Sequence, residues 1–144
     1  LKELAERVVS MARVTPPDED TGLSPSSLLV LDIPSLDLMD SFEPDNSWLL
    51  AQCAKAEEAA LAVEGITNSE GAEASFGRTQ VALAIDSAEN KFAQEYASSM
   101  FSVSVSVLAG KDTSMERDYE FSSKRHHIDL MDASDIGKQA AKLA

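Results

Sequence analysis

The sequence has one cysteine, no long apolar run and no glycine-rich loop. Cys53 stands alone, so the chain cannot form an internal disulfide, and this usage is typical of a protein kept in a reducing compartment. The apolar runs fall far short of the roughly 20 residues that span a bilayer, and no secretion leader is visible. The six glycines are scattered, and we interpret them as turn residues. These absences exclude a disulfide scaffold, a membrane-spanning helix and a glycine-rich phosphate loop.

Basic residues are also scarce. The chain has 25 acidic and 12 basic residues, which give it a formal net charge of −13. Proteins that bind nucleic acid neutralise phosphates with lysine and arginine. The only basic cluster, at residues 124–127, is short and is flanked by acidic residues. We therefore predict no nucleic-acid partner and no membrane-surface partner.

The two histidines, His126 and His127, form with Asp129 the only cluster that resembles a set of metal ligands. Adjacent residues in a strand point to opposite faces, so neighbouring imidazoles do not easily reach one metal ion. No Cys-x-x-Cys or His-x-x-x-His spacing accompanies them, and no catalytic triad can be defended. We interpret the pair as a solvated strand end. The alternative that stays open is a hydrolase in which one histidine works with a nearby carboxylate.

Two other groups of side chains have reactive chemistry. Cys53 lies in the apolar stripe of an expected helix, and nothing near it in the sequence would lower its pKa, so we interpret it as a buried packing residue. Glu116, Asp118 and Glu120 share one face of an expected strand, and we interpret them as a solvated charged face rather than as catalytic carboxylates. The sequence thus predicts no catalytic, cofactor-binding or metal-binding residue.

The strongest structural signal is the alternation Ser-Val-Ser-Val-Ser-Val at residues 102–107. Successive side chains of a strand point to opposite faces, so three valines share one face and three serines share the other. One packed face and one wet face favour antiparallel pairing. Other alternating stretches lie at residues 73–76, 80–85, 92–97 and 115–121. We predict an α+β fold in which helices pack on one face of an antiparallel meander of four to five strands.

Turn-forming residues are expected to separate these strands. We place turns at residues 77–78, 86–90 and 109–113, where glycine, aspartate, asparagine and serine are common. A bulge at residues 98–99 would keep two stretches in one bent strand. Residues 68–71, Asn-Ser-Glu-Gly, are interpreted as the turn that leads from a helix into the first strand.

Three helices are expected from apolar residues at helical spacing. The first covers about residues 1–14, the second about residues 45–64, and the last begins at Asp132. The long connection between the first two contains all five prolines but is too apolar for a free linker. We expect it to lie across the body and to bury its larger apolar residues, which are Ile33, Leu36, Leu38, Met39 and Phe42.

Four short stretches have the order and spacing of a known family. They are residues 11–18 (Met-Ala-Arg-Val-Thr-Pro-Pro-Asp), 36–38 (Leu-Asp-Leu), 66–72 (Ile-Thr-Asn-Ser-Glu-Gly-Ala) and 115–119 (Met-Glu-Arg-Asp-Tyr). Together they resemble the central part of the PmbA/TldD family, and its PmbA branch (also called TldE) more than its TldD branch. The resemblance covers nearly the whole chain.

This resemblance implies that the chain is a segment of a longer protein. The sequence opens on Leu1 and stops at Ala144 without a helix cap, as an excised segment would. Residues 1–15 are then expected to form the C-terminal helix of a preceding domain. Residues 16–144 are expected to form the central α+β domain of a PmbA/TldE-like protein.

The resemblance also implies a function, that of a cytoplasmic bacterial metalloprotease that processes and degrades peptides as a TldD–TldE pair. The family is also known as a modulator of DNA gyrase. Its zinc is held by a His-Glu-x-x-x-His helix of the TldD-type partner, and because this sequence has no His-Glu pair, no catalytic or metal residue carries over. We expect a non-catalytic scaffold that contacts a TldD-like subunit and captures extended peptide at a free strand edge. The alternative is an acidic protein-interaction module without a protease role.

Overall fold

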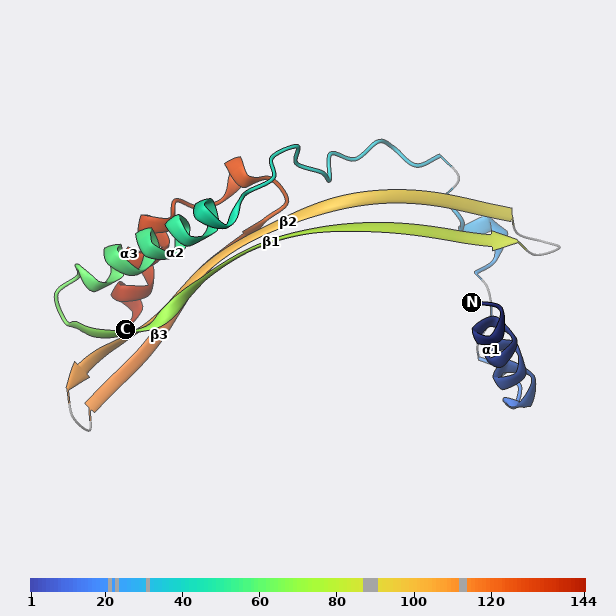
Figure 1. The fold of residues 1–144 in the computed structure, drawn as a ribbon, viewed down its shortest axis with the longest axis horizontal. Coiled ribbons are helices and arrows are strands. Elements are labelled where there is room, and N and C mark those ends of the chain that lie inside the picture. The colour runs from blue at the N-terminus through green and yellow to red at the C-terminus, as the bar shows by residue number, and fades with distance from the viewer. Residues whose placement is uncertain (21, 23, 31, 87–90, 112–113) are drawn as a thin grey trace. The chain divides into compact units, whose positions relative to one another are not determined.

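The computed structural model describes residues 1–144 except residues 21, 23, 31, 87–90 and 112–113. Contacts between residues divide the chain into two compact units, one of residues 1–33 with 85–92 and one of residues 34–84 with 93–144. Among the described residues, no helix has the length and apolar character needed to cross a membrane. In chain order the elements are α1 (Lys2–Val14), η1 (Ser26–Leu28), α2 (Asn46–Leu61), β1 (Ile66–Asp86), β2 (Lys91–Lys111), β3 (Ser114–Lys124), η2 (His127–Asp129) and α3 (Ala133–Leu143) (Figure 1).

The first unit contains α1, η1 and the adjoining ends of β1 and β2. The helix α1 forms where helical spacing predicts it and ends at Thr15, whose backbone is extended. None of its residues is buried, and Leu4, Val8 and Met11 expose their apolar side chains. The predicted division of the chain after residue 15 stays a prediction.

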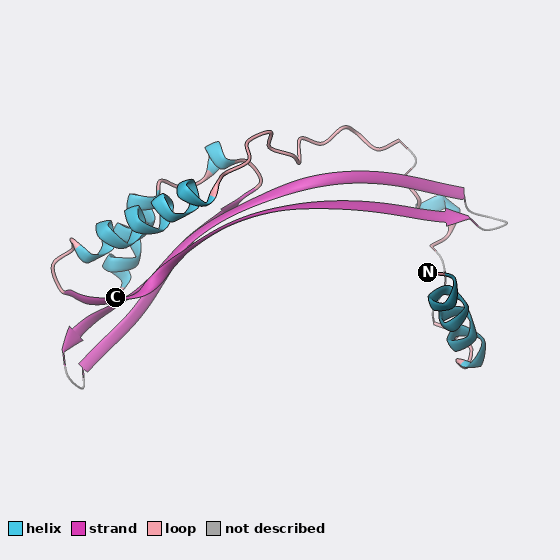
Figure 2. Cartoon of the chain, viewed as in Figure 1, coloured by secondary structure: helices cyan, strands magenta, loops and turns pink. Residues whose placement is uncertain are grey.

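The second unit contains a sheet in the order β1-β2-β3 (Figure 2). The strands β2 and β3 are antiparallel, with Phe101 opposite Lys124 and Lys111 opposite Ser114. The Thr67 hydroxyl donates to the Leu108 carbonyl, and β1 is likewise antiparallel to β2. The antiparallel α+β fold is therefore confirmed, but within the described residues the sheet has three strands, so the predicted four to five is wrong.

The strand count was too high because residues 77–78 were interpreted as a turn. They lie within β1, where the Arg78 guanidinium donates to the Asp40 carbonyl. Residues 98–99 lie within β2, in agreement with the prediction of one continuous strand there. The Ser99 hydroxyl donates to the Arg125 carbonyl and accepts from the Asp40 amide. The predicted turn at 86–90 falls mostly outside the described residues. The loop predicted at 109–113 is wrong for residues 109–111, which lie in β2, and its last two residues lie outside the described part of the chain.

The predicted turn at residues 68–71 is also wrong, because these residues belong to β1. In a regular strand, Glu70 and Ala72 would share a face. Glu70 instead lies beside Ser106 on one face, whereas Ala72 packs against the core on the other. The intervening Gly71 has a φ of 112°, a conformation that L side chains rarely adopt. The alternation thus breaks at Gly71, as it does at a β-bulge.

The core lies between the valine face of the sheet and two helices. Val103, Val105 and Val107 are fully buried or nearly so, which confirms the face predicted from the alternation. The helices contribute small or branched side chains to the same cluster, namely Ala56 and Ala60 from α2 and Ala133, Ile136, Ala140 and Ala141 from α3. Both helices are capped at their N-termini, with Asp45 accepting from the Trp48 amide and Asp132 from the Ser134 amide.

The connection before α2 is buried less than predicted. Leu36 is 60% exposed and Ile33 is exposed as well, so burial of these two residues was predicted wrongly. Leu38, Met39 and Phe42 are partly or half buried. The difference follows from the backbone, because the Ser99 amide donates to the Leu38 carbonyl and ties only this later part of the connection to β2.

Substitution of Gly137 tests the packing of α3 on α2. A Cβ atom at Gly137 would overlap the backbone carbonyl of Ala56, so Gly137→Ala should destabilise the fold by about 1–3 kcal/mol although alanine favours a helix. The control is Gly77→Ala in β1, because a Cβ there meets nothing within 4 Å and should change stability by less than about 0.5 kcal/mol. Urea unfolding measures both variants, and equal stabilities would contradict the packing.

Candidate functional site

The serine face of the sheet lies opposite the valines. In the β2–β3 register, Ser104 is paired with Phe121 and Ser106 with Tyr119. Paired residues share a face of a sheet, so both aromatic side chains lie beside the serines rather than in the core. Their rings stack at a centroid distance of 6.4 Å, and Tyr119 and Phe121 remain 56% and 54% exposed. The face therefore combines hydroxyls with exposed aromatic rings.

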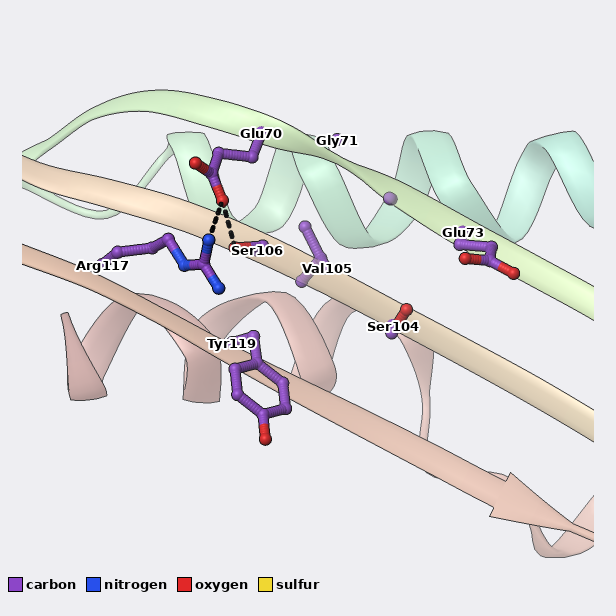
Figure 3. A pocket seen from close by; sticks show the side chains of 9 residues that line it. Glu70, Gly71, Glu73, Ser104, Val105, Ser106, Arg117 and Tyr119 are labelled. Atoms are coloured by element: carbon purple, nitrogen blue, oxygen red, sulfur yellow. Dashed lines mark hydrogen bonds and ion pairs between the residues drawn. The ribbon is translucent and has the colours of Figure 1, made fainter.

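A groove of about 530 Å³ crosses this face, with walls from all three strands. Figure 3 shows Glu70 of β1 facing Arg117 of β3 across Ser106 of β2. The Glu70 carboxylate accepts the Ser106 hydroxyl at 3.0 Å and pairs with the Arg117 guanidinium at 3.2 Å. The other residues with polar side chains that line the groove are Glu73, Ser104 and Tyr119.

The chemistry of the groove is that of a binding surface. The Ser106 hydroxyl donates to a carboxylate that is already paired with Arg117, and no histidine lines the groove to act as a general base. Hydroxyls, a carboxylate, a guanidinium and a phenol offer hydrogen bonds to a partner. These residues can hold a polar chain, and they do not form an activated nucleophile.

A second cluster of polar groups surrounds the buried carboxylate of Asp40. This side chain is only 8% exposed. Its Oδ1 accepts the Phe42 amide at 2.8 Å, and its Oδ2 accepts the His127 amide at 2.8 Å and contacts His127 Nδ1 at 2.6 Å. The hydrogen bond from the Phe42 amide, followed by those from His127, holds the pKa of Asp40 well below its usual range.

Aromatic rings enclose this carboxylate–histidine pair. The His127 ring lies 4.3 Å from the Phe42 ring, which in turn lies 5.5 Å from Trp48. Phe101 of β2 is fully buried and lies 4.8 Å from Phe76. The interpretation of His127 as a solvated strand end is therefore wrong. It belongs to η2 and fastens the connection before α2 to the sheet, a role that no local signal could reveal because Asp40 is 87 residues away.

The neighbouring His126 points to a different partner. Its Nε2 lies 3.2 Å from the Asp37 carbonyl, and this hydrogen bond is the main reason that the pKa of His126 is raised. Asp129, the third member of the predicted cluster, is exposed in η2. The His126 and His127 imidazoles thus contact different residues, Asp37 and Asp40. In the described part of the chain, no group of three or more His, Cys, Asp or Glu side chains is placed to hold a metal ion. These residues do not fit a zinc site.

The remaining reactive side chains have structural surroundings. Cys53 lies in α2, but it is only partly buried and so less buried than predicted. Desolvation by burial is the main cause that raises the pKa of its thiol. Glu116 is exposed, as a solvated face requires, but Asp118 and Glu120 are half-buried. Asp118 accepts the Tyr119 amide and Glu120 accepts the Phe121 amide, each at 2.8 Å. The sequence did not predict this role for either carboxylate.

Comparison with known proteins identifies the family to which this chain belongs. The sequence profile of the PmbA/TldA metallopeptidase central domain matches residues 40–144. The chain therefore belongs to the PmbA/TldA metallopeptidase family and contains its central domain, which confirms the predicted family.

Relatives and solved structures agree with this family. The chain is 33% identical over 143 residues to a metalloprotease PmbA homolog of Haemophilus influenzae, covering 99% of this chain and 31% of the relative. It is 33% identical over 138 residues to the metalloprotease PmbA of Escherichia coli O157:H7, covering 95% of this chain and 30% of that relative. The chain thus spans about a third of the length of the curated relatives.

Two crystal structures share the fold. One is a proposed modulator of DNA gyrase from Bacteroides thetaiotaomicron, with a TM-score of 0.80, 24% identity, and coverage of 99% of this chain and 33% of that chain. The other is a proposed modulator of a DNA gyrase from Thermotoga maritima, with a TM-score of 0.73, 15% identity, and coverage of 98% and 31%. At these identities the likeness concerns the fold alone.

Replacement of Asp40 by asparagine tests the buried cluster. At neutral pH, Asp40→Asn should lower the melting temperature by several degrees, because one oxygen acceptor is replaced by an amide donor facing other donors. The pKa of Asp40 is lower in the folded than in the unfolded chain. Its stabilisation is therefore complete above about pH 4 and is lost as the pH falls through the folded pKa, so the two proteins should converge in acid.

Thermal unfolding from neutral to acidic pH measures this difference. The control is Asp37→Asn, because the Asp37 side chain is 90% exposed and its main contact to His126 uses the backbone carbonyl. An equal loss in the control, or a loss in Asp40→Asn that does not depend on pH, would contradict the assigned role of Asp40.

Proposed function

We propose that this chain is a non-catalytic central segment of a PmbA/TldE-like subunit in a TldD–TldE-type bacterial metalloprotease. Residues 1–15 would form the end of the preceding domain, and residues 16–144 the central domain. The observation that carries the proposal is the asymmetry of the sheet. Helices fill its valine face, whereas the serine face keeps an open groove beside the exposed rings of Tyr119 and Phe121. An exposed aromatic pair beside a polar groove is the composition of a docking surface.

A TldD-like subunit is the proposed partner on this face. It would also supply the zinc, because His126 and His127 are hydrogen-bonded to different residues and do not fit a metal site. The hydroxyls and the Glu70–Arg117 pair of the groove suit the backbone and polar side chains of an extended peptide. The segment would thus support peptide processing in the cytoplasm by positioning partner and substrate.

The test measures how tightly the parent subunit binds its TldD-like partner when the aromatic pair is removed. The double variant Tyr119→Ala/Phe121→Ala should weaken binding about tenfold or more, because exposed aromatic residues at the centre of an interface contribute most of its affinity. The matched control is Tyr96→Ala in β2, a tyrosine that is 49% exposed and does not line the groove. Thermal unfolding verifies that the variants are folded.

Three results would contradict the proposal. The first is unchanged partner binding in the double variant, and the second is an equal loss in Tyr96→Ala. The third is binding that disappears at high salt in the wild type and is insensitive to the aromatic pair. That outcome would favour the acidic interaction module, because attraction between exposed charges is screened by salt.

A further inference from the structure

The outer edge of β3 is the place where another strand would add to this sheet. The strand β3 is the last in the order β1-β2-β3. Alternate residues of a strand direct their backbone groups to opposite sides. The Leu108 and Ser106 carbonyls of β2 accept hydroxyls of β1, so even-numbered residues of β2 direct their backbone groups toward β1. Their β3 partners, which include Tyr119 and Phe121, therefore direct their amides to the outer edge. An incoming strand would need these donors.

Both of these donors are already used. The Asp118 Oδ1 atom accepts the Tyr119 amide at 2.8 Å, and the Glu120 Oε1 atom accepts the Phe121 amide at 2.8 Å. A carboxylate is a stronger acceptor for an amide than a neutral carbonyl, so a partner strand gains little by displacing it. Each carboxylate also places negative charge where the carbonyl oxygen of an incoming strand would have to approach.

We infer that the carboxylates of Asp118 and Glu120 close the β3 edge to strand addition. Soluble proteins must protect exposed sheet edges, because an unpaired edge recruits other strands and leads to aggregation. A partner or an extended peptide then meets this sheet on its serine face and not along β3. On this inference, residues 118–121 are not the strand edge at which an extended peptide would be captured. The inference rests on these hydrogen bonds and stands apart from the proposed function.

The test removes both caps in the double variant Asp118→Ala/Glu120→Ala and measures association by sedimentation velocity. The weight-average mass should rise with concentration more steeply than in the wild type. In dilute samples where both proteins have the same mass, hydrogen exchange at the Tyr119 and Phe121 amides should be at least about threefold faster, because each loses its acceptor.

The matched control is Glu116→Ala. Glu116 shares a strand face with Asp118 and Glu120. Its side chain is not the acceptor of either capped amide, and its removal changes the charge by one unit without opening the edge. A second control, Asp118→Asn/Glu120→Gln, keeps an oxygen acceptor at each position and should associate less than the alanine double variant. Circular dichroism melting verifies that every variant is folded.

Each outcome decides the inference. Faster exchange at the two amides together with added association of the alanine double variant supports it. Unchanged association overturns it, even if exchange is faster, because the caps would then protect two amides without guarding the edge. Added association with unchanged exchange, or equal association in Glu116→Ala, also overturns it, because the new contact would not use the uncapped donors.

Discussion

The burial of three alternating valines beneath two closely packed helices is the interaction on which the rest of the second unit depends. Val103, Val105 and Val107 are at most 2% exposed, and burial of a valine side chain contributes about 1.5–3 kcal/mol. The helices can approach because α3 places Gly137 against the backbone of α2 at Ala56. Small residues at this crossing let both helices reach one face of a narrow sheet.

Because the helices occupy the valine face, the other face is left open. The same alternation that buries the valines places Ser104 and Ser106 outward, and the register of β3 places Tyr119 and Phe121 beside them. The groove is therefore a consequence of the core rather than an independent feature. The hydrogen bonds of Asp40 add a second constraint, because they tie the connection before α2 to β2 and η2 near the buried ring of Phe101.

Local patterns were sufficient to predict the helices, which begin close to Asp45 and Asp132 as expected, and the two faces of β2. Each of these features depends on residues that lie within a few positions of one another, as Asp45 and Trp48 do. The strand count was not predictable in this way, because Arg78, which was placed in a turn, lies within β1 and bonds to Asp40, a residue far along the chain. The same limit applies to the Asp40–His127 pair and to the groove, where Glu70 and Arg117 meet only after the sheet has formed. The family, by contrast, was predicted correctly, because short stretches in a fixed order do not depend on tertiary contacts.

Two neighbouring residues of β2 allow the most direct test of the assignment of the two sheet faces. Val105→Ser places a hydroxyl in the valine core and should lower the free energy of unfolding by about 2–4 kcal/mol. Ser104→Val, one position earlier, lies on the open face and should change it by less than about 0.5 kcal/mol. Urea unfolding of the two variants is the measurement. Equal losses, or a larger loss in Ser104→Val, would contradict a sheet with one packed face and one open face.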